Sequence, residues 1–162
     1  MSILIRKKFL GMVLAGILAF GLQAADTQAA EQTVTKNGEY ASVPVNAENF
    51  TGSARMESLF SPHEGSATYA AYVTFEPGAR THWHIHPKGQ ALIVTAGTGY
   101  VQEWGKEPVL IQPGDVVWCP AGVKHWHGAT AKNAMTHLAI SEKSDKVVTW
   151  LEPVSDEQYP QK

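Results

Sequence analysis

Three histidines and one glutamine stand at spacings that suit a metal site. His84 and His86 form a His-x-His pair, Gln90 follows four residues later, and His125 lies in a second block. Side chains alternate between two faces in an extended segment, so His84 and His86 point the same way, and Gln90 keeps that parity. Both imidazoles can therefore reach one ion, and Gln90 and His125 can complete the set.

Two further histidines could do acid–base chemistry beside such an ion. His127 follows His125 by two residues and so faces the same way, and His137 lies in a late apolar run. An imidazole that is not a ligand can take up or release a proton near neutral pH. We therefore predict His127 and His137 as candidate catalytic residues. The alternative, that each is a hydrogen-bonded core histidine, stays open.

Short apolar runs must position these residues. Runs rich in Val, Ile, Thr, Tyr and Trp occupy residues 67–75, 82–86, 90–96, 99–104, 109–111, 116–118, 125–129 and 134–140. Turn signals rich in glycine and proline separate them, and no long segment has helical periodicity. The pattern predicts an all-β sandwich or barrel, with little helix beyond a short turn near residues 155–158.

Length and composition favour one folded domain behind a processed N-terminus. The chain has 162 residues, of which 44% are hydrophobic and 17% charged, enough to bury a core. Residues 1–30 have the layout of a secretory signal, which predicts an exported, periplasmic or secreted protein; a retained anchor is the alternative. We expect an N-terminal arm or edge strand at 31–60, a barrel at 61–150 and a tail at 151–162.

Charge and cysteine content exclude some functions. The formal net charge is −2, and no cluster of Lys and Arg follows residue 30. A nucleic-acid partner and a stable association with anionic membranes after signal cleavage are therefore not expected. Cys119 is the only cysteine, so no intrachain disulfide can form. Its apolar neighbours favour a buried residue over a nucleophile.

The two histidine blocks resemble the two motifs of the cupin superfamily, G(x5)HxH(x3–4)E(x6)G and G(x5)PxG(x2)H(x3)N. Matching positions are Gly78, His84, His86, Gly97, Gly114, Pro120, Gly122 and His125. Gln90 stands where the family usually has Glu, and Ala129 where it has Asn. The resemblance implies a single small cupin barrel, a double-stranded β-helix or jelly roll, with one metal ion held by His84, His86, Gln90 and His125.

The glutamine changes the expected metal chemistry. A neutral amide removes the one anionic ligand, so the ion becomes a stronger Lewis acid toward a bound hydroxyl or carbonyl oxygen, at a cost in affinity. Gln90 therefore favours Lewis-acid chemistry over oxygen activation, in which an anionic ligand helps to stabilise oxidised iron.

Further segments resemble the bacterial manganese-dependent cupin hydroxynitrile lyases, namely 74–81, 84–90, 92–97, 114–118, 124–129, 134–140 and 156–159. This resemblance implies a manganese ion, with Fe, Ni, Co or Zn as alternatives, and proton transfer by His127 or His137. It also implies a homo-oligomer, a dimer or tetramer. His82, Lys88 and the signal segment depart from the pattern and put the substrate in doubt.

We therefore expect a metal-dependent lyase that cleaves a carbon–carbon bond of a small 2-hydroxy compound. The alternatives are an Fe- or Mn-dependent cupin dioxygenase and a non-catalytic cupin that binds a small ligand or a metal. We expect an apolar cavity, and its wall would include Ala71, Val73, Phe75, Leu92, Val94 and either Trp118 or Trp126. His82 is expected at the rim, and His63 in an exposed loop.

Overall fold

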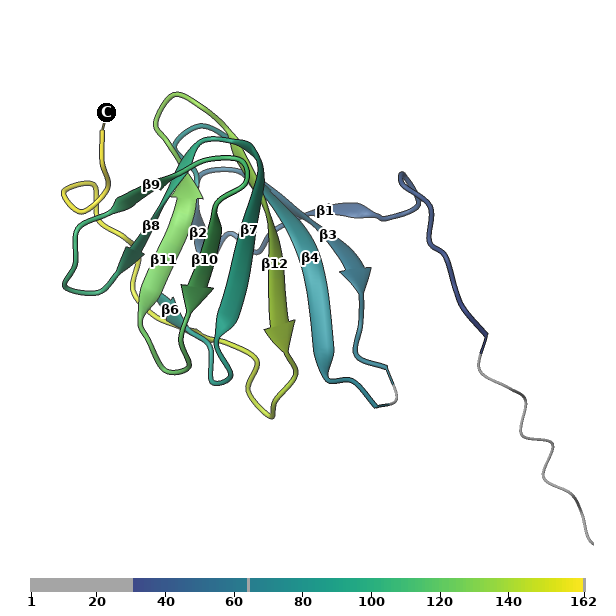
Figure 1. The fold of residues 1–162 in the computed structure, drawn as a ribbon. Helices are drawn as coiled ribbons and strands as arrows, with labels where there is room; N and C mark the ends of the chain where they lie inside the picture. The colour runs from purple at the N-terminus through teal and green to yellow at the C-terminus, as the bar shows by residue number, and fades with distance from the viewer. Residues whose placement is uncertain (1–30, 64, 162) are drawn as a thin grey trace, which may run out of the picture. The chain divides into compact units, whose positions relative to one another are not determined.

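Antiparallel strands make up the regular structure of this chain, as the computed structural model shows (Figure 1). The structure describes residues 31–63 and 65–161, so the predicted signal at residues 1–30 lies outside the described residues. Contacts divide the chain after Val34, and every strand belongs to the second unit, which begins at Thr35. Within the described residues no helix is long and apolar enough to span a membrane.

Two sheets form the second unit. The first has the order β1 (Ser42–Pro44), β3 (Ala54–Phe60), β4 (Thr68–Phe75), β12 (Met135–Glu142), β7 (Gln90–Gly97) and β10 (Val116–Cys119). The second has the order β13 (Thr149–Trp150), β6 (His84–Ile85), β11 (His125–Ala129), β5 (Arg80–Thr81) and β2 (Phe50–Thr51). On this sheet β8 (Gly99–Glu103) pairs with β11, and β9 (Val109–Ile111) pairs with β8. The curled antiparallel sheets confirm the predicted all-β cupin barrel.

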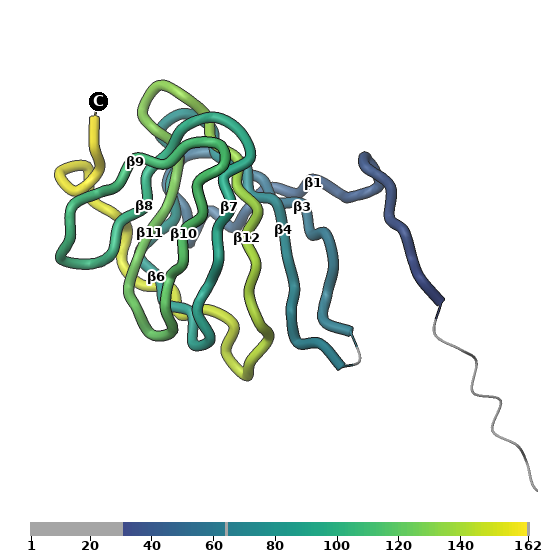
Figure 2. The backbone as a smooth tube through the Cα atoms, in the orientation of Figure 1, coloured from purple at the N-terminus to yellow at the C-terminus, as the bar shows by residue number. Residues whose placement is uncertain are grey.

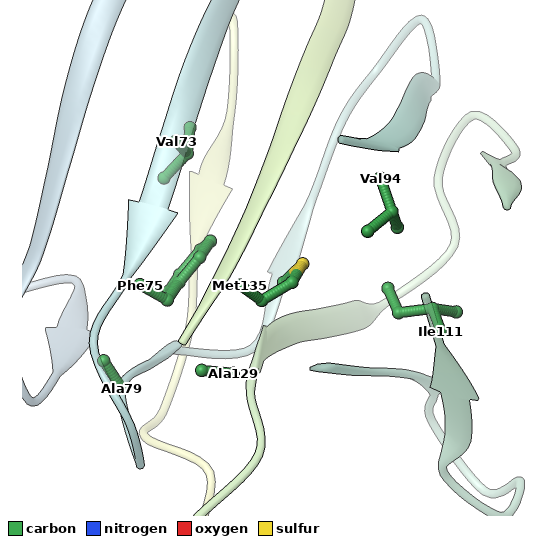
Figure 3. Packing of buried hydrophobic residues seen from close by; sticks show 7 residues of the cluster. All are labelled: Val73, Phe75, Ala79, Val94, Ile111, Ala129 and Met135. Carbon is green, nitrogen blue, oxygen red and sulfur yellow. The ribbon is translucent and has the colours of Figure 1, made fainter. Parts of the chain in front are cut away.

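Alternating side chains on these strands fill one end of the barrel. Val73 and Phe75 of β4, Val94 of β7 and Met135 of β12 belong to one buried apolar cluster, in which the Phe75 and Met135 side chains point toward each other (Figure 3). Phe75 and Met135 are fully buried. Because apolar burial contributes roughly 25 cal/mol per Å², this cluster holds the two sheets together beneath the polar interior.

A second apolar cluster lies where the C-terminal segment returns to the barrel. Val154 and Tyr159 pack against Trp83 and Trp126. Arg80 holds the same segment, because its guanidinium donates to the Val154 carbonyl and lies 4.4 Å from the centre of the Tyr159 ring. Figure 2 traces this segment in yellow to the C-terminus. The strand before it, β13, pairs with β6.

Two local irregularities shape β7. The register between β7 and β12 shifts between Thr136 and His137, and Thr95 occupies the extra position on β7. Such bulges redirect side chains and are common beside active sites. Gly97 ends the strand with a positive φ of 73°, and a Cβ there would overlap the carbonyl oxygen of Ala134. Only glycine fits this motif position.

Most predicted strands occur, with two differences, the broken run 82–86 and the short strands β2 and β13. Run 82–86 is broken, because β5 ends at Thr81 and β6 holds only His84 and Ile85. Strand β3 lies within the range 31–60, for which an arm or an edge strand was expected, and it pairs along its length with β4. Strands β2 and β13 are too short to leave a pattern. The short turn predicted near residues 155–158 is present: the backbone amides of Gln158 and Tyr159 both donate to the Ser155 carbonyl, which is one turn of helix.

Cys119 gives a simple test of the packing. The residue is 4% exposed, and burial, with a smaller contribution from Glu103, raises the pKa of its thiol to about 12. We expect the native protein to resist a disulfide-exchange reagent at pH 8, because the thiolate is the reactive form. Unfolding in guanidinium should restore rapid labelling. Fast labelling of the native protein would show that β10 opens freely.

Candidate metal centre

All six predicted site residues lie in the interior of the barrel. His84 comes from β6, His86 follows that strand, Gln90 begins β7, and His125 lies opposite His84 on β11. His127 comes from β11 and His137 from β12. Each is at most 7% exposed. Three segments distant in sequence therefore deliver their polar side chains to one buried region.

The histidine rings form a tight cluster. The ring centres of His84 and His125 are 4.3 Å apart, and His86 lies 5.2 Å from His84. Among the described His, Cys, Asp and Glu residues, the group whose ligand atoms all lie within 4.8 Å is His84, His125 and His127. Three buried histidines could thus hold a metal ion. This trio contains His127, whereas the predicted ligand set contains His86.

Backbone carbonyls orient three of the imidazoles. The Nδ1 atom of His84 lies 2.9 Å from the carbonyl oxygen of His82, and that of His125 lies 3.0 Å from that of Val123. His86 makes the same contact with Val147 at 3.0 Å. Because a carbonyl only accepts, each Nδ1 must carry the hydrogen, and each Nε2 keeps its lone pair. This tautomer is the one in which Nε2 can bind a metal.

Unpartnered buried atoms show that the residues fit a metal ion. Gln90 Oε1 and His125 Nε2 are buried and have no hydrogen-bond partner within the chain. Buried polar atoms are rarely left in this state, because each costs about 1–3 kcal/mol. Both atoms belong to the predicted ligand set, and a bound cation would satisfy them.

The side chains of His127 and His137 are hydrogen-bonded to each other. His137 Nε2 lies 3.0 Å from His127 Nδ1, and both rings are buried. The outer nitrogens, His127 Nε2 and His137 Nδ1, have no partner within the chain. Phe75 packs against both rings, with its centre 5.7 Å from that of His127 and 5.5 Å from that of His137. The pair is thus held by an apolar wall.

Burial keeps these histidines neutral. It lowers the pKa of His125 and of His137 to about 4. It also lowers the pKa of His84 and of His127 well below the ordinary value, and the neighbouring histidines add to the effect. A pKa below the ambient pH leaves the imidazole uncharged, so its lone pair is available to a metal ion.

An apolar cavity of about 190 Å³ is lined by four of the histidines and by Gln90; the four are His84, His86, His127 and His137. Ala71 and Val73 line it as predicted. The tryptophan in its wall is Trp150, whose ring centre lies 4.9 Å from that of His84. The predicted alternatives are wrong, because Trp118 is 63% exposed and Trp126 packs in the cluster around Val154.

The other residues that were predicted for the cavity wall, the rim and the exposed loop lie as follows. Phe75, Leu92 and Val94 are buried beside the cavity and are not among its lining residues. The His82 ring is partly exposed, and this residue reaches the site through its carbonyl. His63 is exposed, as predicted.

Tyr69 and Ser141 also line the cavity, although sequence reasoning did not name them. Ser141 keeps the parity of His137 along the same strand, and Tyr69 keeps that of Ala71 and Val73. That signal could have found both residues.

Comparison with known proteins agrees with this architecture. The cupin domain model matches residues 71–141. A protein named (R)-mandelonitrile lyase from Granulicella tundricola is 53% identical to this chain over 127 residues. The matched region covers 78% of this chain and 97% of that protein.

Solved structures show the same fold. A cupin-like protein from Thermotoga maritima has a TM-score of 0.68 and 39% identity, over 79% of this chain and 95% of that one. A predicted oxalate decarboxylase from the same organism has a TM-score of 0.61 over 74% of this chain and all of that one; at 23% identity it shows the fold alone. On its motifs, its barrel and these relatives, the chain belongs to the cupin family.

Proposed function

We propose that the protein binds one divalent metal ion through His84, His86, Gln90 and His125, and that the ion is manganese. The three carbonyl-anchored imidazoles and the unpartnered oxygen of Gln90 support this set. The resemblance to manganese-dependent cupins favours manganese, although a site of three nitrogens and one oxygen accepts other divalent ions. When bound, the ion would supply polarisation of a hydroxyl or carbonyl oxygen.

Metal analysis of single variants tests the ligand set. We expect one ion per chain in the wild type, and for His86→Ala a loss of affinity greater than the roughly 10–100-fold that an outer-sphere change costs. His127→Ala should keep its metal. The reverse result, in which His127→Ala loses the ion and His86→Ala keeps it, would instead identify His84, His125 and His127 as ligands. Elemental analysis after dialysis gives the answer.

We further propose that the enzyme is a lyase that cleaves small 2-hydroxynitriles into a carbonyl compound and hydrogen cyanide. The observation that carries this proposal is the bonded His127–His137 pair, which lies beside the cluster of candidate ligands in an apolar cavity. The relative named (R)-mandelonitrile lyase, with 53% identity, supports the same reaction.

The hydrogen bond between His127 and His137 supplies a proton acceptor in either tautomer. If His127 Nδ1 donates to His137 Nε2, then His127 Nε2 is unprotonated and can accept a proton. If His137 Nε2 donates instead, the free lone pair is on His137 Nδ1. Both outer nitrogens lack a partner within the chain, so either can face a substrate hydroxyl.

The bond changes balance without an oxidant. The histidine pair takes the hydroxyl proton, the oxygen forms the new carbonyl bond, and the electron pair of the carbon–carbon bond leaves with cyanide. Cyanide then receives a proton from the pair and leaves as hydrogen cyanide. The apolar wall formed by Ala71, Val73, Phe50 and Trp150 would hold the organic group and exclude water.

An activity assay with mandelonitrile tests the lyase proposal. Metal-loaded wild type should release benzaldehyde and hydrogen cyanide. His137→Ala should keep its metal but react about 10²–10⁴-fold more slowly, because general acid–base catalysis usually contributes a factor of that size. Benzaldehyde absorbance and metal content are measured on the same preparations.

Dioxygen provides the control for this assay. Lyase chemistry is redox-neutral, so the rate should be equal with and without oxygen. A fully metal-loaded wild type that is inactive toward a panel of cyanohydrins would refute the lyase proposal. Consumption of oxygen with a diketone or phenolic substrate would point to a dioxygenase.

We also propose export and self-association. The layout of residues 1–30 supports export. Exposed apolar side chains on the end strands β9 and β10 support a homo-oligomer, because unpaired sheet edges are usually covered. These side chains are Val109, Leu110, Val116 and Trp118, each more than half exposed. Light scattering should therefore report a dimer or tetramer of the mature chain, and a monomer at micromolar concentration would contradict this.

A further inference from the structure

Gln90, Ser141 and Tyr69 form one row across three neighbouring strands. Ser141 of β12 lies directly opposite Gln90 of β7, and on its other side it lies opposite Tyr69 of β4. Figure 1 shows these strands as consecutive members of the first sheet. All three side chains line the cavity that is also lined by His84, His86, His127 and His137. The row therefore connects a candidate ligand to a phenol through one hydroxyl.

The hydrogen bonds along this row have a direction. Gln90 Nε2 donates to Ser141 Oγ at 3.5 Å, whereas Gln90 Oε1 is buried and has no partner within the chain. The Ser141 hydroxyl is also hydrogen-bonded to the Tyr69 side chain. Burial raises the pKa of Tyr69, and this hydrogen bond opposes the rise. Because Ser141 Oγ accepts from Gln90, the one hydrogen of the serine hydroxyl remains available to the phenolic oxygen of Tyr69, which lies opposite Ser141 on β4.

We propose that Ser141 and Tyr69 are positioning residues that determine which end of the Gln90 amide faces the histidines. A serine hydroxyl has one hydrogen. When Tyr69 accepts that hydrogen, Ser141 can only accept from Gln90, so the NH₂ group of the amide points to Ser141. The amide oxygen is then left for the cation. This inference rests on the metal site proposed above.

A glutamine ligand needs such a device and a glutamate does not. The two carboxylate oxygens are equivalent, so either can bind a cation. An amide that turns over presents two N–H donors and no available lone pair, and a metal ion cannot be bound there. The row thus compensates for the replacement of the usual family glutamate by Gln90.

Metal titration of paired variants tests the proposal with a readout that does not depend on catalysis. Tyr69→Phe frees the Ser141 hydrogen to donate to Gln90 Oε1, so it should weaken Mn²⁺ binding about 10-fold, the lower end of outer-sphere effects. Ser141→Ala should weaken it similarly. In a Gln90→Glu background, Tyr69→Phe should cause no loss, because the freed hydroxyl can donate to a carboxylate.

The visible spectrum of cobalt-loaded protein adds a second measurement. Tyr69→Phe and Ser141→Ala should both shift it toward the spectrum of Gln90→Ala, since all three withdraw the same oxygen. Thr74→Val is the matched control. It removes the 2.9 Å hydrogen bond between the hydroxyls of Thr74 and Thr136, which links β4 and β12 on the face away from the cavity. This variant should lower the stability of the protein and leave Mn²⁺ affinity unchanged.

Two outcomes would overturn the proposal. An equal loss of affinity from Tyr69→Phe with glutamine and with glutamate at position 90 would show a merely structural role. Unchanged Mn²⁺ binding by Gln90→Ala would remove Gln90 from the ligands, and the proposed metal site would fail with it. Lyase activity enters neither measurement, so the catalytic proposal can fail independently.

Discussion

The structure depends on satisfying a set of imidazoles buried in an apolar barrel. A buried polar nitrogen without a partner costs about 1–3 kcal/mol, and several of them would unfold a domain of ordinary stability. Backbone carbonyls of His82, Val123 and Val147 satisfy one nitrogen on each of three rings. The same contacts set the tautomer, so the remaining nitrogens are free to bind a cation. Stability and metal chemistry thus share one set of hydrogen bonds.

The interior separates two kinds of polar group. His84, His125 and Gln90 lie on strands and His86 directly follows β6, and all four side chains are buried in the interior of the barrel. His127 and His137 are hydrogen-bonded to each other through one ring nitrogen each, and the other ring nitrogen of each has no partner within the chain. Phe75 packs against this pair, which joins the apolar core to the two histidines. In the proposed function, the metal ion and the histidine pair act on the same small molecule through separate residues.

Much of the fold could be predicted because its signals are local. Runs of β-branched and aromatic residues between glycine and proline turns marked most strands, and the motif spacing identified the cupin family. Strands of two residues leave no pattern, so β2 and β13 were missed. The broken run at 82–86 shows the same limit, since β5 and β6 both pair with β11 but at separate points. The exposure of Trp118 follows from its place on β10 at the end of the sheet order, which composition does not reveal.

The sequence by itself determined which residues could do the chemistry, because period-two spacing puts His84, His86 and Gln90 on one face whatever surrounds them. It also determined the departure from the family glutamate. Only the tertiary structure decided which side chains meet across strands: His127 with His137, Gln90 with Ser141, and Trp150 with His84. The physical reason is register. The pairing of strands far apart in the chain depends on how the whole barrel closes, and a shift of one residue would turn each of these side chains to the other face.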